Sequence, residues 1–87
     1  MKELMKNSKK LIEARNFLDV NYDEGIRILG DQYALLHHGE GIPWSEATGL
    51  NYKSISDYLR KEKKISLEAL AMALIGSEFF LKNRNKK

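Results

Sequence analysis

The 87-residue chain has no cysteine and only one proline. Without cysteine it cannot form disulfides, thiolate zinc sites or iron–sulfur clusters. Its longest apolar run, residues 69–75, is far shorter than the roughly 20 residues of a membrane-spanning helix. The N-terminus also lacks an apolar signal region, so we expect a cytoplasmic protein that does not enter a membrane.

The residue patterns of common enzyme sites are missing as well. The sequence has no phosphate-binding glycine loop, no paired nucleophile and base, and no paired carboxylates. His37 and His38, with Glu40 nearby, suggest a metal site at first sight. Adjacent positions on a helix point to different faces, however, so we interpret the histidines as the C-terminal cap of a helix. We therefore expect no enzyme activity, no cofactor and no bound metal.

Charge is unevenly distributed along the chain. The formal net charge is +3. Residues 17–50 hold one basic and six acidic side chains, whereas residues 1–16, 51–64 and 79–87 are basic overall. If these three basic segments share a face, that face would attract a polyanion.

The spacing of apolar residues predicts an all-α fold of five or six helices. Apolar side chains recur three, four or seven positions apart, and no segment shows the alternation of a strand. The expected helices span residues 3–18, 24–37, 42–48, 52–61 and 67–75, with a last short helix that begins at Ser77.

Capping residues mark several of these boundaries. Asn21 or Asp23 is expected to cap the second helix, and Gly39 to close it in the left-handed conformation. Asn51 and Ser66 are in position to cap the helices that follow them, and Gly76 is expected to end the helix that begins at Leu67.

Residues 41–60 fit a helix-turn-helix. Such a motif needs a small residue where the two helices meet, which is Ser45, and a glycine four residues later for the left-handed turn, which is Gly49. It then needs apolar residues at Leu50, Ile55 and Tyr58. The remaining inward positions hold Trp44 and Thr48 before the turn and Leu59 after it.

Residues 49–74, GLNYKSISDYLRKEKKISLEALAMAL, resemble the lambda repressor/Cro family of phage and bacterial regulators. That family typically has a Gly-apolar-Ser turn, a recognition helix with an inward Ile, a basic loop, and a Ser-Leu-Glu-x-Leu helix ending in Ala-x-x-Leu. The resemblance covers about residues 24–76. The chain departs from the pattern at Ser45 (usually Ala), at Ile65 (often Pro) and in the Pro-Trp start at 43–44.

The resemblance implies a repressor-type regulator that binds double-stranded DNA as a homodimer, with its second motif helix in the major groove. The outward residues of that helix are the candidates for reading bases: Asn51, Tyr52, Lys53, Ser54, Ser56, Asp57 and Arg60. The candidates for phosphate contacts are Lys61, Lys63 and Lys64.

The sequence divides into an N-terminal helical extension (1–22), the helix-turn-helix domain (23–76) and a short apolar segment with a basic tail (77–87). Phe79, Phe80 and Leu81 cannot all face one small core, because adjacent helix positions differ by about 100° in direction. We therefore expect them to form a dimer interface. The alternative candidate is the helix over 3–18.

A second hypothesis is a protein-interaction module that keeps this fold but has little or no DNA binding. Examples are an antirepressor, an antitoxin or an inhibitor of a host factor. The acidic stretch 17–50 would then serve as the partner surface, and the fold alone does not exclude this reading.

Overall fold

A computed structural model describes residues 9–84. Residues 1–8 and 85–87 lie outside the described residues, and with them the start of the first predicted helix and the end of the basic tail. Within 9–84 the chain is helical and contains no strand. Its elements are α2 (Lys9–Val20), α3 (Tyr22–Tyr33), α4 (Gly41–Thr48), the 3-10 helix η1 (Tyr52–Ser54), α5 (Ile55–Leu59) and α6 (Leu67–Asn83).

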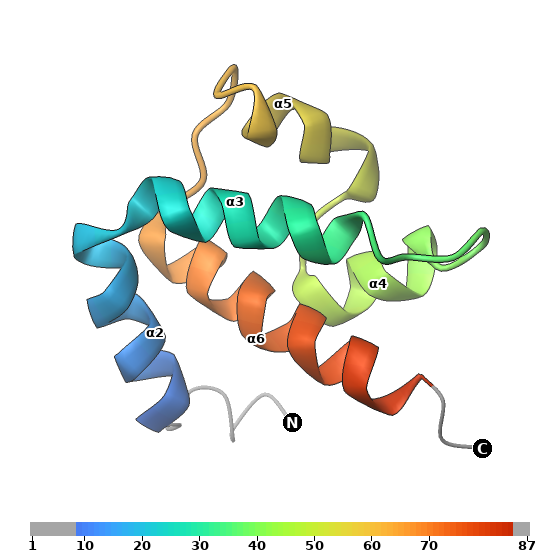
Figure 1. The fold of residues 1–87 in the computed structure, drawn as a ribbon, viewed down its shortest axis with the longest axis horizontal. Coiled ribbons are helices and arrows are strands. Elements are labelled where there is room, and N and C mark those ends of the chain that lie inside the picture. The colour runs from blue at the N-terminus through green and yellow to red at the C-terminus, as the bar shows by residue number, and fades with distance from the viewer. Residues whose placement is uncertain (1–8, 85–87) are drawn as a thin grey trace.

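The long helix α6 is the centre of the fold. It packs against α2, α3 and α4, and α3 crosses over it in Figure 1. Helix α5 lies on the other side of α3 from α6 in that view. The buried apolar residues come from all of these elements except η1 and from the loops beside α5: Leu11, Leu18, Ile26, Leu29, Trp44, Leu50, Ile55, Ile65, Leu70, Ala71 and Ala73.

The start of α3 depends on a close approach to α2. A Cβ on Gly25 would collide with Leu18, which is fully buried. Asn21 precedes the helix, but its side chain does not cap it as predicted. The Asn21 amide instead donates to the Phe17 carbonyl, 3.0 Å away, at the end of α2.

Helix α3 ends four residues earlier than predicted. Its C-cap is Ala34, and Gly39, at φ 88°, lies in the following loop and not at the helix end. The loop groups that would have continued the helix have other partners. The Leu35 carbonyl accepts from Arg84 at 3.0 Å, and the His37 amide donates to Glu40 at 2.6 Å.

Helix α6 continues through the glycine that was predicted to end it. Ser66 caps its start as expected, since the hydroxyl accepts from the Ala69 amide at 3.1 Å. Gly76 is buried inside the helix, where a Cβ would collide with the Ala47 carbonyl of α4. Ser77 is therefore an interior residue of α6 and not the start of another helix. The close approach of α4 and α6 outweighs the roughly 1 kcal/mol that glycine costs a helix.

No helix within residues 9–84 is long and apolar enough to cross a bilayer.

Candidate nucleic-acid interface

The turn between α4 and η1 has the conformation that the sequence predicts. Gly49 is left-handed at φ 80°, and its amide donates to the Ser45 carbonyl at 2.8 Å. The Ser45 hydroxyl accepts from the Tyr52 amide at 2.9 Å, and the Thr48 hydroxyl accepts from the Leu50 amide at 3.2 Å. Side chains of α4 thus hold the start of the next helix directly. Ser45 is small, as the motif requires, and it also contributes a hydrogen bond to this turn.

The second helix of the motif is shorter than predicted. Asn51 caps it, with its side-chain oxygen accepting from the Lys53 amide at 2.9 Å. The helix ends at Leu59, not at Lys61, because the chain turns there in a Schellman motif. The Lys61 amide donates to Tyr58 at 3.0 Å, the Glu62 amide donates to Asp57 at 2.8 Å, and Lys61 is left-handed at φ 63°.

Few side chains attach this short helix to the core. Ile55 is fully buried and Leu50 nearly so, while Tyr58 is half-buried. Leu59 is 37% exposed, although one of its methyl groups lies 2.9 Å from the position that a Cβ on Gly30 of α3 would take. The helix is therefore held by one fully buried side chain, Ile55, and by neighbouring side chains that are partly exposed.

The base-reading candidates do not all reach solvent freely. Lys53 and Ser56 are exposed, and within residues 9–84 Lys53 forms no ion pair. Asn51 is exposed, but its side chain is the helix cap. Ser54 and Tyr52 are half-buried, and the Tyr52 ring packs about 3.0 Å from where a Cβ on Gly41 would lie. Lys53 and Ser56 are thus the freest side chains on this part of the surface.

Asp57 and Arg60, the other two candidates, belong to an ion-pair cluster. Arg60 lies 3.1 Å from both Asp57 and Glu62, and Lys63 lies 3.9 Å from Asp57. The hydrogen bond from Arg60 lowers the pKa of Glu62, and the same bond raises the pKa of Arg60. The positive charge of Arg60 is therefore matched by adjacent carboxylates.

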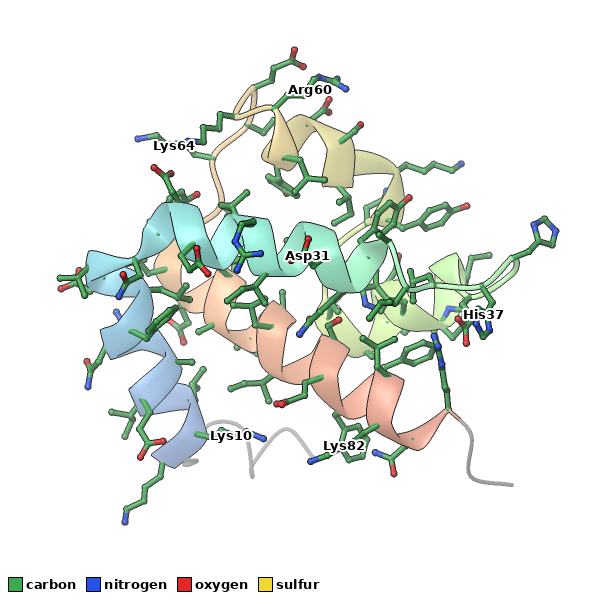
Figure 2. All side chains as sticks on the ribbon, viewed as in Figure 1. Lys10, Asp31, His37, Arg60, Lys64 and Lys82 are labelled. Carbon is green, nitrogen blue, oxygen red and sulfur yellow. The ribbon has the colours of Figure 1, made fainter. Side chains whose placement is uncertain are left out.

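The candidates for phosphate contacts also differ in whether a carboxylate pairs with them. Lys61 pairs with Asp23 of α3 at 3.0 Å and Lys63 with Asp57, whereas Lys64 is exposed and has no ion pair within residues 9–84. The basic segments also do not gather at one edge. In Figure 2, Arg60 and Lys64 project beside α5, while Lys10 and Lys82 lie at the opposite edge of the molecule.

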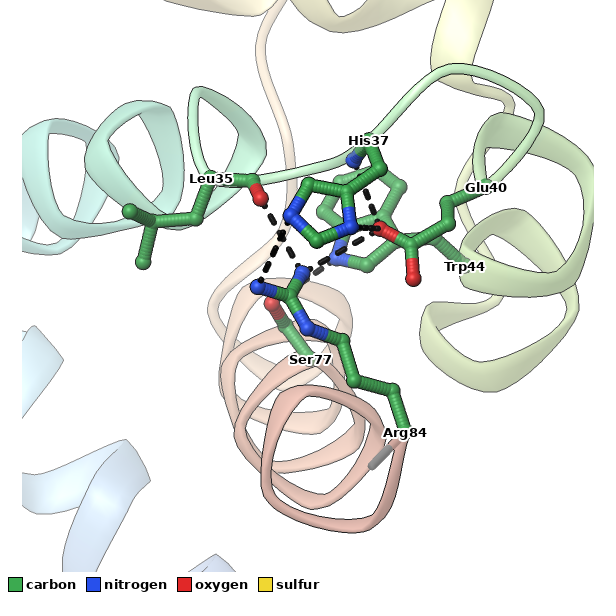
Figure 3. A network of polar contacts seen from close by, with 6 residues as sticks. All are labelled: Leu35, His37, Glu40, Trp44, Ser77 and Arg84. Carbon is green, nitrogen blue, oxygen red and sulfur yellow. Dashed lines mark hydrogen bonds and ion pairs between the residues drawn. The ribbon is translucent and has the colours of Figure 1, made fainter. Parts of the chain in front are cut away.

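A polar network holds the loop that leads into α4 (Figure 3). Arg84, at the end of α6, donates to the Leu35 carbonyl at 3.0 Å and to Glu40 at 3.1 Å. The side chains of Arg84 and Glu40 are both 19% exposed. His37 and His38 lie in this loop, beyond the end of α3 at Tyr33, so the prediction that they cap the end of that helix is wrong. No three potential metal ligands cluster among residues 9–84.

A second contact anchors α4 itself. The Trp44 indole N–H donates to the Ser77 hydroxyl at 2.8 Å, and both side chains are fully buried. The sequence predicts that Trp44 faces inward but does not predict its partner. A lone serine in an apolar helix has no sequence signal for such a pairing, because its partner lies 33 positions away.

The three dimer candidates lie on the last part of α6. Phe79 is 51% exposed, Phe80 packs partly buried against the core, and Leu81 is half-buried. The three side chains therefore point in different directions, and Phe79 carries most of the exposed apolar surface.

No protein-family model, curated protein or solved structure matches the chain.

Proposed function

We propose that the chain is a sequence-specific DNA-binding regulator of the repressor type, which binds the major groove as a homodimer. The observation that carries the proposal is the left-handed Gly49, which joins α4, anchored by the buried Trp44, to a capped helix with Lys53 and Ser56 on its outer side. A helix presented in this way places its N-terminal residues against base edges.

The outward side chains suit different parts of DNA. Lys53 donates to guanine O6 and N7, and Ser56 bonds to either kind of base. Asp57 accepts from cytosine N4 when its ion pairs open. Lys64, which is free of ion pairs within the described chain, suits a phosphate contact that positions the domain without reading sequence.

A homodimer is part of the proposal because the reading helix is short. η1 and α5 together run from Tyr52 to Leu59, which allows contact with only a few base pairs. Two copies on a palindromic site double the contacts, with half-sites about 34 Å apart.

One observation favours a second candidate function, a protein-interaction module. Arg60, Lys61 and Lys63 each pair with a carboxylate, which removes much of the positive field that a DNA-binding surface needs. An exposed helix bordered by both charge signs suits a protein partner of mixed charge.

Selection of bound duplexes from a random DNA pool tests the proposal. We expect an enriched palindrome, and affinity for it that falls steeply as salt rises. Lys53→Ala should weaken binding by about 10- to 100-fold, equivalent to about 1–3 kcal/mol, and should relax preference at one base pair. Lys9→Ala, which removes an exposed lysine on α2, is the matched control and should bind nearly as wild type.

The interaction module predicts the opposite results. No sequence would be enriched, and any weak binding to DNA would be equal for Lys53→Ala and wild type. That outcome would overturn the proposal that the chain recognises DNA.

A further inference from the structure

The outer face of α6 carries an apolar stripe with two exposed ends. It consists of Met72, Ile75 and Phe79. Met72 is 37% exposed and Phe79 is 51% exposed. Ile75, between them, is half-buried and packs partly against the core on the side of α2. At about 100° per residue, the three side chains lie within about 60° of one another around the helix.

This stripe faces away from the proposed DNA-reading helix. Leu70, on the opposite side of α6, faces α3, since its methyl group lies 3.2 Å from the position of a Cβ on Gly25. Helix α5 in turn packs on α3. A partner seated on the stripe would therefore leave Lys53 and Ser56 open to solvent.

Opposite charges stand at the two ends of the stripe. Glu68 and Lys82 are both exposed and lie within about 55° of the stripe's centre line. Neither forms an ion pair within the described part of the chain. In sequence they stand seven residues before and seven residues after Ile75. An antiparallel copy of the same helix would bring each glutamate opposite a lysine.

We propose that two copies of the chain associate by antiparallel packing of α6 on α6, with Ile75 at the two-fold axis. Met72 of one copy then contacts Phe79 of the partner subunit, and Glu68 pairs with Lys82 of the partner subunit, each twice. This inference rests on the homodimer in the proposed function and assigns its surface. It keeps Phe79 from the sequence-based interface and leaves out Phe80, which points to a different side of α6 from the stripe.

The size of the contact sets the expected strength. Helix α6 has 17 residues and is therefore about 25 Å long, so one helix pair gives a small interface. We expect a dissociation constant in the micromolar range, on the order of 10 μM.

Charge reversal tests the antiparallel pairing without DNA. Glu68→Lys and Lys82→Glu should each weaken self-association about tenfold in sedimentation velocity, because each homodimer then opposes like charges twice. An equimolar mixture of the two variants should associate as well as wild type. In the mixed dimer, two lysines of one copy face two glutamates of the other. Because folding defects cannot be cured by mixing, the recovery is specific to the interface.

A disulfide test locates the axis independently. The chain has no cysteine, so Ile75→Cys introduces a single thiol. Under mild oxidation it should form a covalent dimer, whereas Glu46→Cys, on the exposed side of α4, should remain monomeric. A wild-type monomer at about 1 mM, a mixture that associates no better than its components, or equal crosslinking of the two cysteine variants would each overturn the proposal. DNA takes no part in these measurements, so their failure is distinct from a failure to select an operator.

Discussion

The two helices of the motif are held in different ways. Helix α4 contacts α6 through the fully buried Trp44–Ser77 hydrogen bond and through the close approach at Gly76. Helix α5 has one fully buried residue, Ile55, and is otherwise bordered by exposed ion pairs. The first helix is part of the core, whereas the second is attached at its edge.

This difference assigns separate tasks to the two helices. A buried hydrogen bond and interlocking backbones tolerate little movement, so α4 sets the position of the turn. A five-residue helix with few buried contacts opens locally at low free-energy cost, and its exposed side chains adjust to a binding partner. Changes at the α4–α6 contact should therefore reduce global stability much more than changes around α5.

The largest effect is expected at Gly76. In Gly76→Ala the new methyl group would collide with the Ala47 carbonyl and push α4 away from α6. We expect a loss of about 3 kcal/mol in the free energy of unfolding, measured by urea denaturation followed by circular dichroism.

Gly39→Ala is the matched control for that change. Gly39 is left-handed at φ 88°, but nothing lies within 4 Å of the added carbon. It should cost about 1 kcal/mol through backbone conformation alone. Equal losses in the two variants would show that the contact at Gly76 is looser than described.

Removal of the buried hydroxyl should come next. Ser77→Ala leaves the Trp44 indole N–H without a partner in the core, which we expect to cost about 2 kcal/mol. Trp44→Phe combined with Ser77→Ala should show strong coupling in a double-mutant cycle, because the second change then removes no remaining hydrogen bond. Additive losses in thermal or urea unfolding would show that this hydrogen bond contributes little.

The turn itself should be less sensitive than the α4–α6 contact. Gly49→Val places a β-branched residue at φ 80°, and no atom lies within 4 Å of the added Cβ. We expect a loss of about 1.5 kcal/mol from backbone strain. Gly49→Asn, a residue that tolerates this conformation, should lose less. Melting temperatures equal to wild type for both variants would contradict the left-handed turn.

Local chemistry accounts for what the sequence predicted correctly. The left-handed Gly49, the Asn51 and Ser66 caps and the inward Trp44 follow from steric or hydrogen-bonding needs within a few residues. These features place α4, η1, α5 and the start of α6, and with them most of the candidate surface.

The errors at Gly76, at the end of α3 and at Lys61 involve contacts between distant segments. The residues around Gly76 predict a helix end. Gly76 instead lies inside α6, where Ala47, 29 positions earlier, leaves no room for a Cβ. The end of α3 depends on Arg84, whose bond to Leu35 spans 49 positions. The ion pair of Lys61 with Asp23 of α3 depends on how the loop folds back after α5. The spacing of residue types along a sequence does not show which distant segments come into contact.

The smallest expected effect is a gain in stability at Lys61, beside α5. Its backbone is left-handed at φ 63°, a conformation that costs most residues about 1 kcal/mol or more relative to glycine. Lys61→Gly removes that strain but also removes the ion pair with Asp23, whose two side chains are 62% and 78% exposed. Such exposed pairs contribute little, so we expect a net gain of about 0.5 kcal/mol.

An increased urea midpoint with an unchanged slope would establish the gain in Lys61→Gly. Asp23→Asn is the companion variant, since it removes the ion pair but leaves the backbone strain, and it should change stability by less than about 0.5 kcal/mol. If the proposed function holds, Lys61→Gly should also bind its operator more weakly, with a salt dependence reduced by about one phosphate contact. A variant that is more stable but binds DNA less well would show that a lysine at this strained position serves binding and not folding. A loss of stability in Lys61→Gly would instead show that the Asp23 pair outweighs the strain, and that α5 is held more firmly than its exposed surroundings indicate.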